Sequence, residues 1–173
     1  MANLHQINVQ FNPQEDRLIL SVRADDNSEI RAWLTRRYTR LLLGILGKLA
    51  IQNQEGADSA DAQKAMQQFQ RDSALSGADF DTEYDQSATT HPLGEEPVLV
   101  TKIEYKPAAN QMLVVSLGLP DGRNINLNLT KDLLFVFIKL LEEGTEKAEW
   151  DLVAASDQEL ALAQGKPAGA AIH

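Results

Sequence analysis

The residues that could perform chemistry are few, and their spacing matches no catalytic pattern. The chain has three histidines, at positions 5, 91 and 173, and no cysteine. None of these histidines stands beside a plausible nucleophile or in a metal-ligand pattern such as HExxH, and the glycine motifs of nucleotide-binding loops and hydrolase nucleophile turns are missing. The sequence therefore predicts no catalytic residue and no cofactor, and we expect a protein that is not an enzyme.

An acidic stretch at 79–85, DFDTEYD, is the nearest approach to a metal site. Its carboxylates alternate along the chain as they do in a calcium loop: Asp79, Asp81, Glu83 and Asp85. Such a loop needs glycine at its sixth position and glutamate at its twelfth, and here Tyr84 and Thr90 occupy those places. We therefore expect a solvated acidic loop and no metal site.

Arginines in the first quarter of the chain are the strongest indication of binding. The stretch EIRAWLTRRYTR, at 29–40, has four of them in a chain whose net charge is -9. Arg36 and Arg37 fall in the first turn of an expected helix, where the helix dipole disfavours cations, and such a helix start with guanidinium groups can bind an anion. The candidate contact residues are Arg17, Arg23, Arg31, Trp33, Arg36, Arg37 and Arg40.

Three partners for these arginines remain open. The first is intramolecular, since residues 57–97 account for -7 of the net charge. The acidic segment 79–96, which contains the stretch 79–85, or a neighbouring carboxylate such as Glu29 could pair with the arginines. The second is a protein, either another chain or a second copy. The third is single-stranded nucleic acid or another polyanion, which the negative net charge disfavours although an arginine face with one tryptophan suits it.

The elements that position these residues follow from hydrophobic periodicity. Period-two alternation predicts strands at 7–11, 18–24 and 30–34. Thr35 then stands where the N-cap of a helix belongs, and apolar residues at helical spacing follow it up to Leu49. The first unit is therefore predicted as three strands and an amphipathic helix.

The second half of the chain repeats this pattern. Residues 113–141 align without a gap on residues 18–46 with seven identities, Leu34/Leu129 and Thr35/Thr130 among them. We predict a duplicated βββα unit, with repeat one at 4–51 and repeat two at 98–144. A flexible acidic linker at 52–97 is expected to separate the repeats, because its composition is rich in acidic and turn-forming residues.

The predicted fold class is α+β. Each unit has to bury one sheet face, so we expect one antiparallel sheet, or two stacked half-sheets, with the two amphipathic helices packed on the apolar face. This duplication resembles the arrangement of Whirly and PUR-type single-strand binders in architecture, without any of their motifs. The resemblance implies nucleic-acid binding, which we keep as the alternative function.

The boundaries and the cellular setting are predicted from composition. We expect a single domain at 1–153 and a flexible C-terminal tail at 154–173. The start of the chain lacks the pattern of a secretory signal, and the longest apolar run is far too short for a membrane span. A cytoplasmic protein without membrane contact is expected.

The second predicted helix suggests a contact surface. Its inward stripe is expected at Leu133, Val136, Phe137, Leu140 and Leu141. Phe135 falls on the opposite side of the helix, and an exposed phenylalanine next to Ile138 would form an apolar patch. We predict Phe135 and Ile138 as interface residues of a self-associating protein, with folding of the Trp150 segment over them as the alternative.

Overall fold

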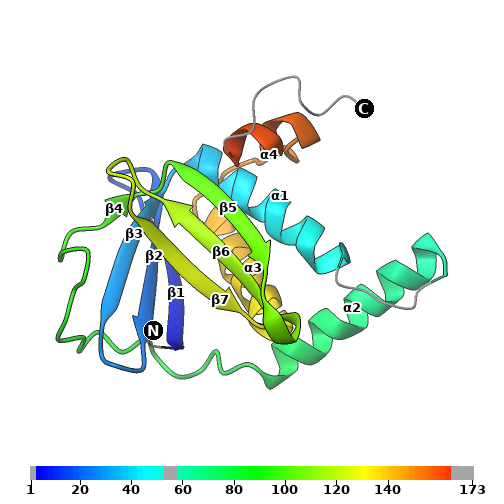
Figure 1. Ribbon diagram of the computed structural model, residues 1–173, viewed down its shortest axis with the longest axis horizontal. Helices are drawn as coiled ribbons and strands as arrows, with labels where there is room; N and C mark the ends of the chain where they lie inside the picture. The colour runs from blue at the N-terminus through cyan, green and yellow to red at the C-terminus, as the bar shows by residue number, and fades with distance from the viewer. Residues whose placement is uncertain (1–2, 53–57, 165–173) are drawn as a thin grey trace.

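The fold is α+β, with four α-helices and two sheets in the residues that the structure describes (Figure 1). The computed structural model describes residues 3–52 and 58–164. The strands are β1 (Leu4–Asn12), β2 (Arg17–Ala24), β3 (Glu29–Leu34), β4 (Val98–Leu99), β5 (Lys102–Pro107), β6 (Leu113–Gly118) and β7 (Asn124–Leu129). The helices are α1 (Arg36–Gln52), α2 (Ala60–Gly77), α3 (Lys131–Lys147) and α4 (Asp157–Ala163), with a short 3-10 turn η1 (Ala109–Gln111). No helix among the described residues is both long and apolar enough to cross a membrane.

The first sheet has the order β1-β2-β3-β4. Its first three strands are antiparallel neighbours, and the two residues of β4 pair in parallel with β3. The alternation predicted for β2 places Leu18 and Leu20 in the core, where both are fully buried, and it turns the arginines of this strand to the opposite face.

The second sheet has the order β5-β6-β7 and is antiparallel throughout. The chain passes from one sheet to the other at two consecutive residues. The amide of Val100 donates to the carbonyl of Trp33 in the first sheet, and the amide of Thr101 donates to the carbonyl of Gly118 in the second. Gly122, with φ of +88°, forms the turn between β6 and β7, as its Asp-Gly sequence predicts.

Both long central helices begin where the sequence predicts. The hydroxyl of Thr35 accepts from the amide of Tyr38, and the hydroxyl of Thr130 accepts from the amide of Leu133. Strands β1 to β3 run into α1, and strands β5 to β7 run into α3. The two helices pack against each other between the two sheets (Figure 1).

The exposure predicted for Phe135 and Ile138 is wrong. Phe135 is 1% exposed and Ile138 is 6% exposed. The reason is that α3 contacts more than one layer: β1 of the first sheet, β7 of the second, α1 and α2 all touch it. At Gly144 a β-carbon would come within 3.1 Å of the Val9 and Leu18 side chains, which shows how closely the helix lies on the first sheet. The side of α3 that carries Phe135 and Ile138 is therefore covered and is not available for an interface.

The Trp150 segment does not provide the alternative cover either. The Trp150 ring meets the Phe11 ring edge-on at 6.1 Å, and its indole N–H donates to Asp16 at 2.9 Å. Trp150 therefore closes the β1–β2 end of the first sheet.

The stretches predicted as linker and tail contain helices. Ser59 caps α2 by accepting from the amide of Ala62 at 3.1 Å, and α2 lies in the predicted linker. The predicted tail contains α4, whose Leu160 and Ala163 are buried, so 154–164 is not a frayed end. Residues 53–57 of the linker and 165–173 of the tail lie outside the described residues.

Candidate functional site

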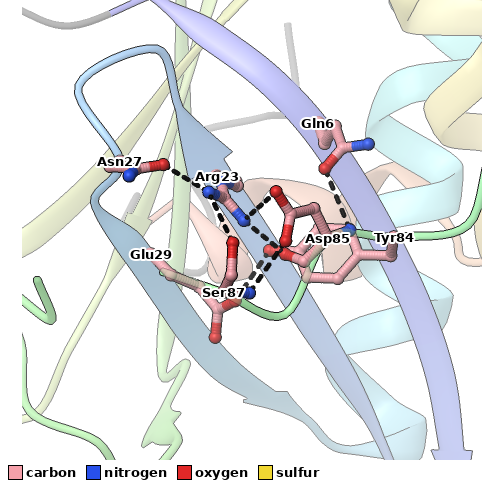
Figure 2. A network of polar contacts seen from close by, with 7 residues as sticks. All are labelled: Gln6, Arg23, Asn27, Glu29, Tyr84, Asp85 and Ser87. Atoms are coloured by element: carbon pink, nitrogen blue, oxygen red, sulfur yellow. Dashed lines mark hydrogen bonds and ion pairs between the residues drawn. The ribbon is translucent and has the colours of Figure 1, made fainter. Parts of the chain in front are cut away.

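Arg23 is the centre of a buried polar cluster on the outer face of the first sheet. It is only 4% exposed, because the chain from Tyr84 to Ser87 lies across it (Figure 2). Its Nη1 forms an ion pair with the Asp85 carboxylate at 2.9 Å and donates to the Asp85 carbonyl at 2.7 Å. Its Nη2 donates to the side chains of Asn27 and Ser87. This arginine therefore binds the acidic stretch, as the intramolecular alternative predicts.

Glu29 is the second buried charge of the cluster. It is 1% exposed and accepts hydrogen bonds from Arg31 Nε and from the Tyr84 hydroxyl, the latter at 3.1 Å. Burial, together with the negative charge of Glu29, raises the pKa of the Tyr84 phenol. The Tyr84 hydroxyl therefore stays protonated and donates its hydrogen bond to the Glu29 carboxylate. Glu29 thus pairs with Arg31 of its own strand.

The acidic stretch is also held through its backbone. The amide of Asp85 donates to the Gln6 side chain at 3.1 Å, as Figure 2 shows. Further along, the amide of Glu29 donates to the carbonyl of Thr90 at 2.9 Å, and Ser28 and Thr90 form a parallel bridge. Hydrogen bonds from Ser87 lower the pKa of Asp85, and Arg23 lowers it further, which favours the charged form of this carboxylate beside Arg23.

Two arginines of α1 hold the segment that follows α3. Arg36 donates to the Asp151 carbonyl at 3.2 Å, and Arg40 donates to the Val153 carbonyl at 3.3 Å. Arg40 also pairs with Glu159 of α4. Gly44 leaves room for this helix, because a β-carbon there would lie 3.0 Å from the Leu160 side chain. These two arginines therefore have a structural partner inside the chain.

The remaining candidates, Arg17, Trp33 and Arg37, have no ion pair or side-chain hydrogen bond among the described residues. Arg37 lies with its guanidinium 6.0 Å from the centre of the Tyr38 ring. Trp33 is half-buried on β3, opposite Ile19 of β2. The seven residues grouped by the sequence are thus divided: one binds the acidic stretch, one pairs with Glu29, two bind the C-terminal segment, and three have none of these partners.

We expect acid to weaken the contact between α4 and α1. Arg40, with help from Ser156, lowers the pKa of Glu159 to about 2, below its ordinary value of 4.5. A lowered pKa in the folded state means that this carboxylate stabilises the docked helix above about pH 4.5 and that the contribution is lost as the pH falls toward 2. Carboxyl carbon shifts of Glu159 in an NMR titration should give the low pKa, and Arg40→Gln should return it toward 4.5. A pKa near 4.5 in the unmodified protein would show that the pair does not form.

A cleft of about 690 Å³ lies beside the Arg23 cluster. Its walls come from β1, from the C-terminal end of α2, from the acidic stretch and from the start of α3. Apolar side chains line it together with polar ones such as His5 and Asp132; the apolar group is Ile7, Ala74, Phe80, Leu133, Val136 and Leu140. Three residues of the predicted inward stripe of α3 thus line a cleft, and the sequence could not show this because four separate segments form it.

The cleft continues along one side of α2. Ser73 and Gly77 line it, and Phe69 lies on the same row of this helix, since residues four apart share a face. Phe69 is 74% exposed. Ala74 is the one buried residue of α2, and Figure 1 shows the N-terminal part of this helix extending away from the sheets. The sequence signal for this surface is the weak apolar stripe that includes Met66 and Phe69.

The fold and the site define an α+β protein with a mixed apolar and polar cleft. Within the described residues, no group of three or more His, Cys, Asp or Glu side chains is arranged to hold a metal ion. Comparison with protein-family models, with curated proteins and with solved structures finds no match to this chain.

Proposed function

We propose that the protein acts by binding and not by catalysis, and that it self-associates through the cleft and the Phe69 side of α2. The observation that supports this proposal is the position of Phe69: a phenylalanine that is 74% exposed stands on the helix row that runs into an apolar-lined cleft. Large exposed apolar side chains beside a concave surface are typical of protein contacts.

A second copy suits this surface because it offers both a projecting group and a cleft. A two-fold symmetric interface uses the same patch on both subunits. Phe69 and Ser73 lie about 6 Å apart along the helix axis, given the rise per residue. A two-fold axis beside α2 would therefore let each Phe69 enter the cleft of the other copy, with Leu133 and Val136 as its apolar contacts.

The test is the concentration-dependent mass of the protein. We expect analytical ultracentrifugation to show a dimer, and Phe69→Glu to weaken it by about 30-fold, as loss of a central aromatic anchor does. Val153→Glu is the matched control, because Val153 is 75% exposed and lies away from the cleft. Ser73→Trp, which fills the cleft from its wall, should weaken the dimer without removing Phe69.

Two results would contradict this proposal. A monomeric mass for the unmodified protein at about 0.1 mM would exclude a dimer of useful affinity. A dimer that is equally weakened by Phe69→Glu and by Val153→Glu would exclude this surface.

Binding of single-stranded nucleic acid or another polyanion is the second candidate. A chain segment covers the arginine face and is held there by the ion pair of Asp85 with Arg23. The Asp85 side chain is 51% exposed, so a competing anion could reach this pair. Displacement of that segment would free Arg23, next to Arg31 and Trp33. The covering segment is acidic, so it would compete with a polyanion for the arginine side chains.

For this second candidate we expect Asp85→Ala to raise the affinity for a mixed-sequence single-stranded oligonucleotide several-fold. Fluorescence anisotropy at about 50 mM salt, where phosphate contacts are strong, is the measurement. Asp81→Ala makes the same change in net charge without touching Arg23, and should have little effect. Absence of binding by all three proteins would remove polyanion binding from consideration.

The finer features of the fold belong to the same proposal. The shared order of three strands and a helix, the shared threonine N-caps and the seven identities support a duplicated βββα unit in one domain. The acidic composition of residues 57–97 supports the prediction that this segment is an insertion between the two units. A cytoplasmic location is proposed with them.

A further inference from the structure

Strand β7 is at the edge of the second sheet, and a row of its backbone groups has no strand partner among the described residues. In the β6–β7 hairpin the amide of Leu119 donates to the carbonyl of Arg123, and the register pairs Leu117 with Ile125 and Val115 with Leu127. Backbone groups alternate in direction along a strand, so Ile125 and Leu127 bond to β6. The N–H and C=O groups of Asn124, Asn126 and Asn128 consequently point away from β6, and no described strand pairs with them.

Strands β1 and β5, which also lie at sheet edges, are protected. In β1 a register irregularity between Leu4 and Gln6 interrupts the edge. The edge strand β5 carries Lys102, Lys106 and Pro107, and α4 contacts it. Bulges, lysines, prolines and covering helices are the devices that prevent an added strand. Strand β7, with the sequence NINLNL, has no charge, no proline and no irregularity in its pairing.

The open edge of β7 borders a groove with an apolar floor. A cavity of about 330 Å³ lies between β7 and the first sheet. Its floor is formed by half-buried apolar residues of β1, β2 and β3, namely Leu4, Val22 and Ile30. Among the residues that the structure describes, Asp26 is the one charged residue that lines it. The unpaired backbone groups thus stand beside a surface that an apolar side chain could cover.

We propose that an extended segment of another polypeptide adds to the edge of β7 as a fourth strand of the second sheet. Six residues of β7 offer an edge of about 20 Å, which suits a segment of five or six residues. Alternate side chains of the segment would face Leu4, Val22 and Ile30 and should be apolar, because every second residue of a strand points to the same face. A lysine or arginine near Asp26 would match the single charge of the groove.

A second copy of the chain fits this groove less well than a free segment. The β7 strand of another copy would bring its own β6 and α3 with it, and the groove between β7 and the first sheet leaves no room for them (Figure 1). This site is separate from the cleft beside α2, and neither proposal depends on the other.

The test uses labelled peptides of alternating pattern. We expect fluorescein-labelled Lys-Val-Thr-Val-Thr-Val-Lys to bind the full chain in an anisotropy titration, and versions with terminal Ser or Glu to bind progressively less. N-methylation of alternate peptide residues in one register should abolish binding, and in the other register it should not, since only one set of peptide amides faces β7.

Variants of β7 identify the site. Asn126→Pro removes an N–H that faces the groove and none that bonds to β6, so we expect a loss of affinity of at least about tenfold. Asn126→Ala removes the same side chain and its contact with Ser116 while keeping the N–H, so it should bind normally. In hydrogen exchange, the peptide should slow the amides of residues 124, 126 and 128, whereas those of 125 and 127 are slow already.

Several results would overturn the proposal. One is the absence of binding by all three peptides at about 1 mM. Another is equal binding by the Pro and Ala variants, or indifference to the register of N-methylation. Protection of the amide of residue 126 that rises with protein concentration and needs no peptide would show that a second copy occupies the edge.

Discussion

Phe135→Ala is expected to lower the free energy of unfolding by about 3 to 5 kcal/mol, the usual cost of truncating a buried phenylalanine. Phe135 is 1% exposed, and α3 is enclosed by both sheets and by two helices. The same substitution at Phe69, which is 74% exposed, should change the stability by less than about 0.5 kcal/mol. The two variants compare one side-chain change in opposite surroundings.

Urea unfolding followed by circular dichroism measures both variants, at a protein concentration at which any dimer has dissociated. The slope of the free energy against urea should stay the same if both variants keep the native fold. A loss at Phe135 no larger than that at Phe69 would contradict the buried position of α3. It would also restore Phe135 as a candidate for the protein surface.

Arg31→Ala is expected to lower the free energy of unfolding by about 2 to 3 kcal/mol, because it leaves the carboxylate of Glu29 buried without its ion pair. Glu29 is 1% exposed and would keep the Tyr84 hydroxyl as its hydrogen-bond donor. We place the value below that of a fully buried pair because the Arg31 side chain is 38% exposed. Arg37→Ala, at an exposed position without a carboxylate partner, should cost less than about 0.5 kcal/mol.

A double variant separates charge burial from lost packing. Glu29→Gln removes the charge and keeps the shape, so Arg31→Ala with Glu29→Gln should be more stable than Arg31→Ala alone. If the double variant is the less stable of the two, the cost of Arg31→Ala comes from its contacts and not from the stranded carboxylate. Chemical denaturation of the four proteins completes the thermodynamic cycle.

Local patterns predicted the elements well and the exposure of their residues poorly. Alternation located β2 and β3, Thr35 and Thr130 marked the helix starts, and Asp121–Gly122 marked a turn, because these depend on neighbours within a few residues. The helical spacing of apolar residues, taken alone, predicted a single buried face for α3. It failed at Phe135 because α3 touches two sheets and two helices, so the side that carries Phe135 is covered as well.

The arginines that the sequence analysis grouped together show the same contrast between local patterns and long-range contacts. The sequence placed Arg23 and Arg31 on the polar face of the first sheet and indicated the acidic segment 79–96 and Glu29 as possible partners. It could not separate these residues from Arg36 and Arg40, which bind the segment after α3. Contacts over more than a hundred residues of chain depend on how the helices cross, and no local periodicity encodes that crossing.

By itself the sequence determined an α+β protein, the order of most of its elements and the caps that start its two central helices, since each follows from interactions within a turn or a strand pair. Only the tertiary structure decided that the acidic stretch covers Arg23, that Phe135 lies in the core, and that a cleft and an open strand edge remain at the surface. Each of these depends on the packing of segments far apart in the chain, where burial of apolar area sets the arrangement.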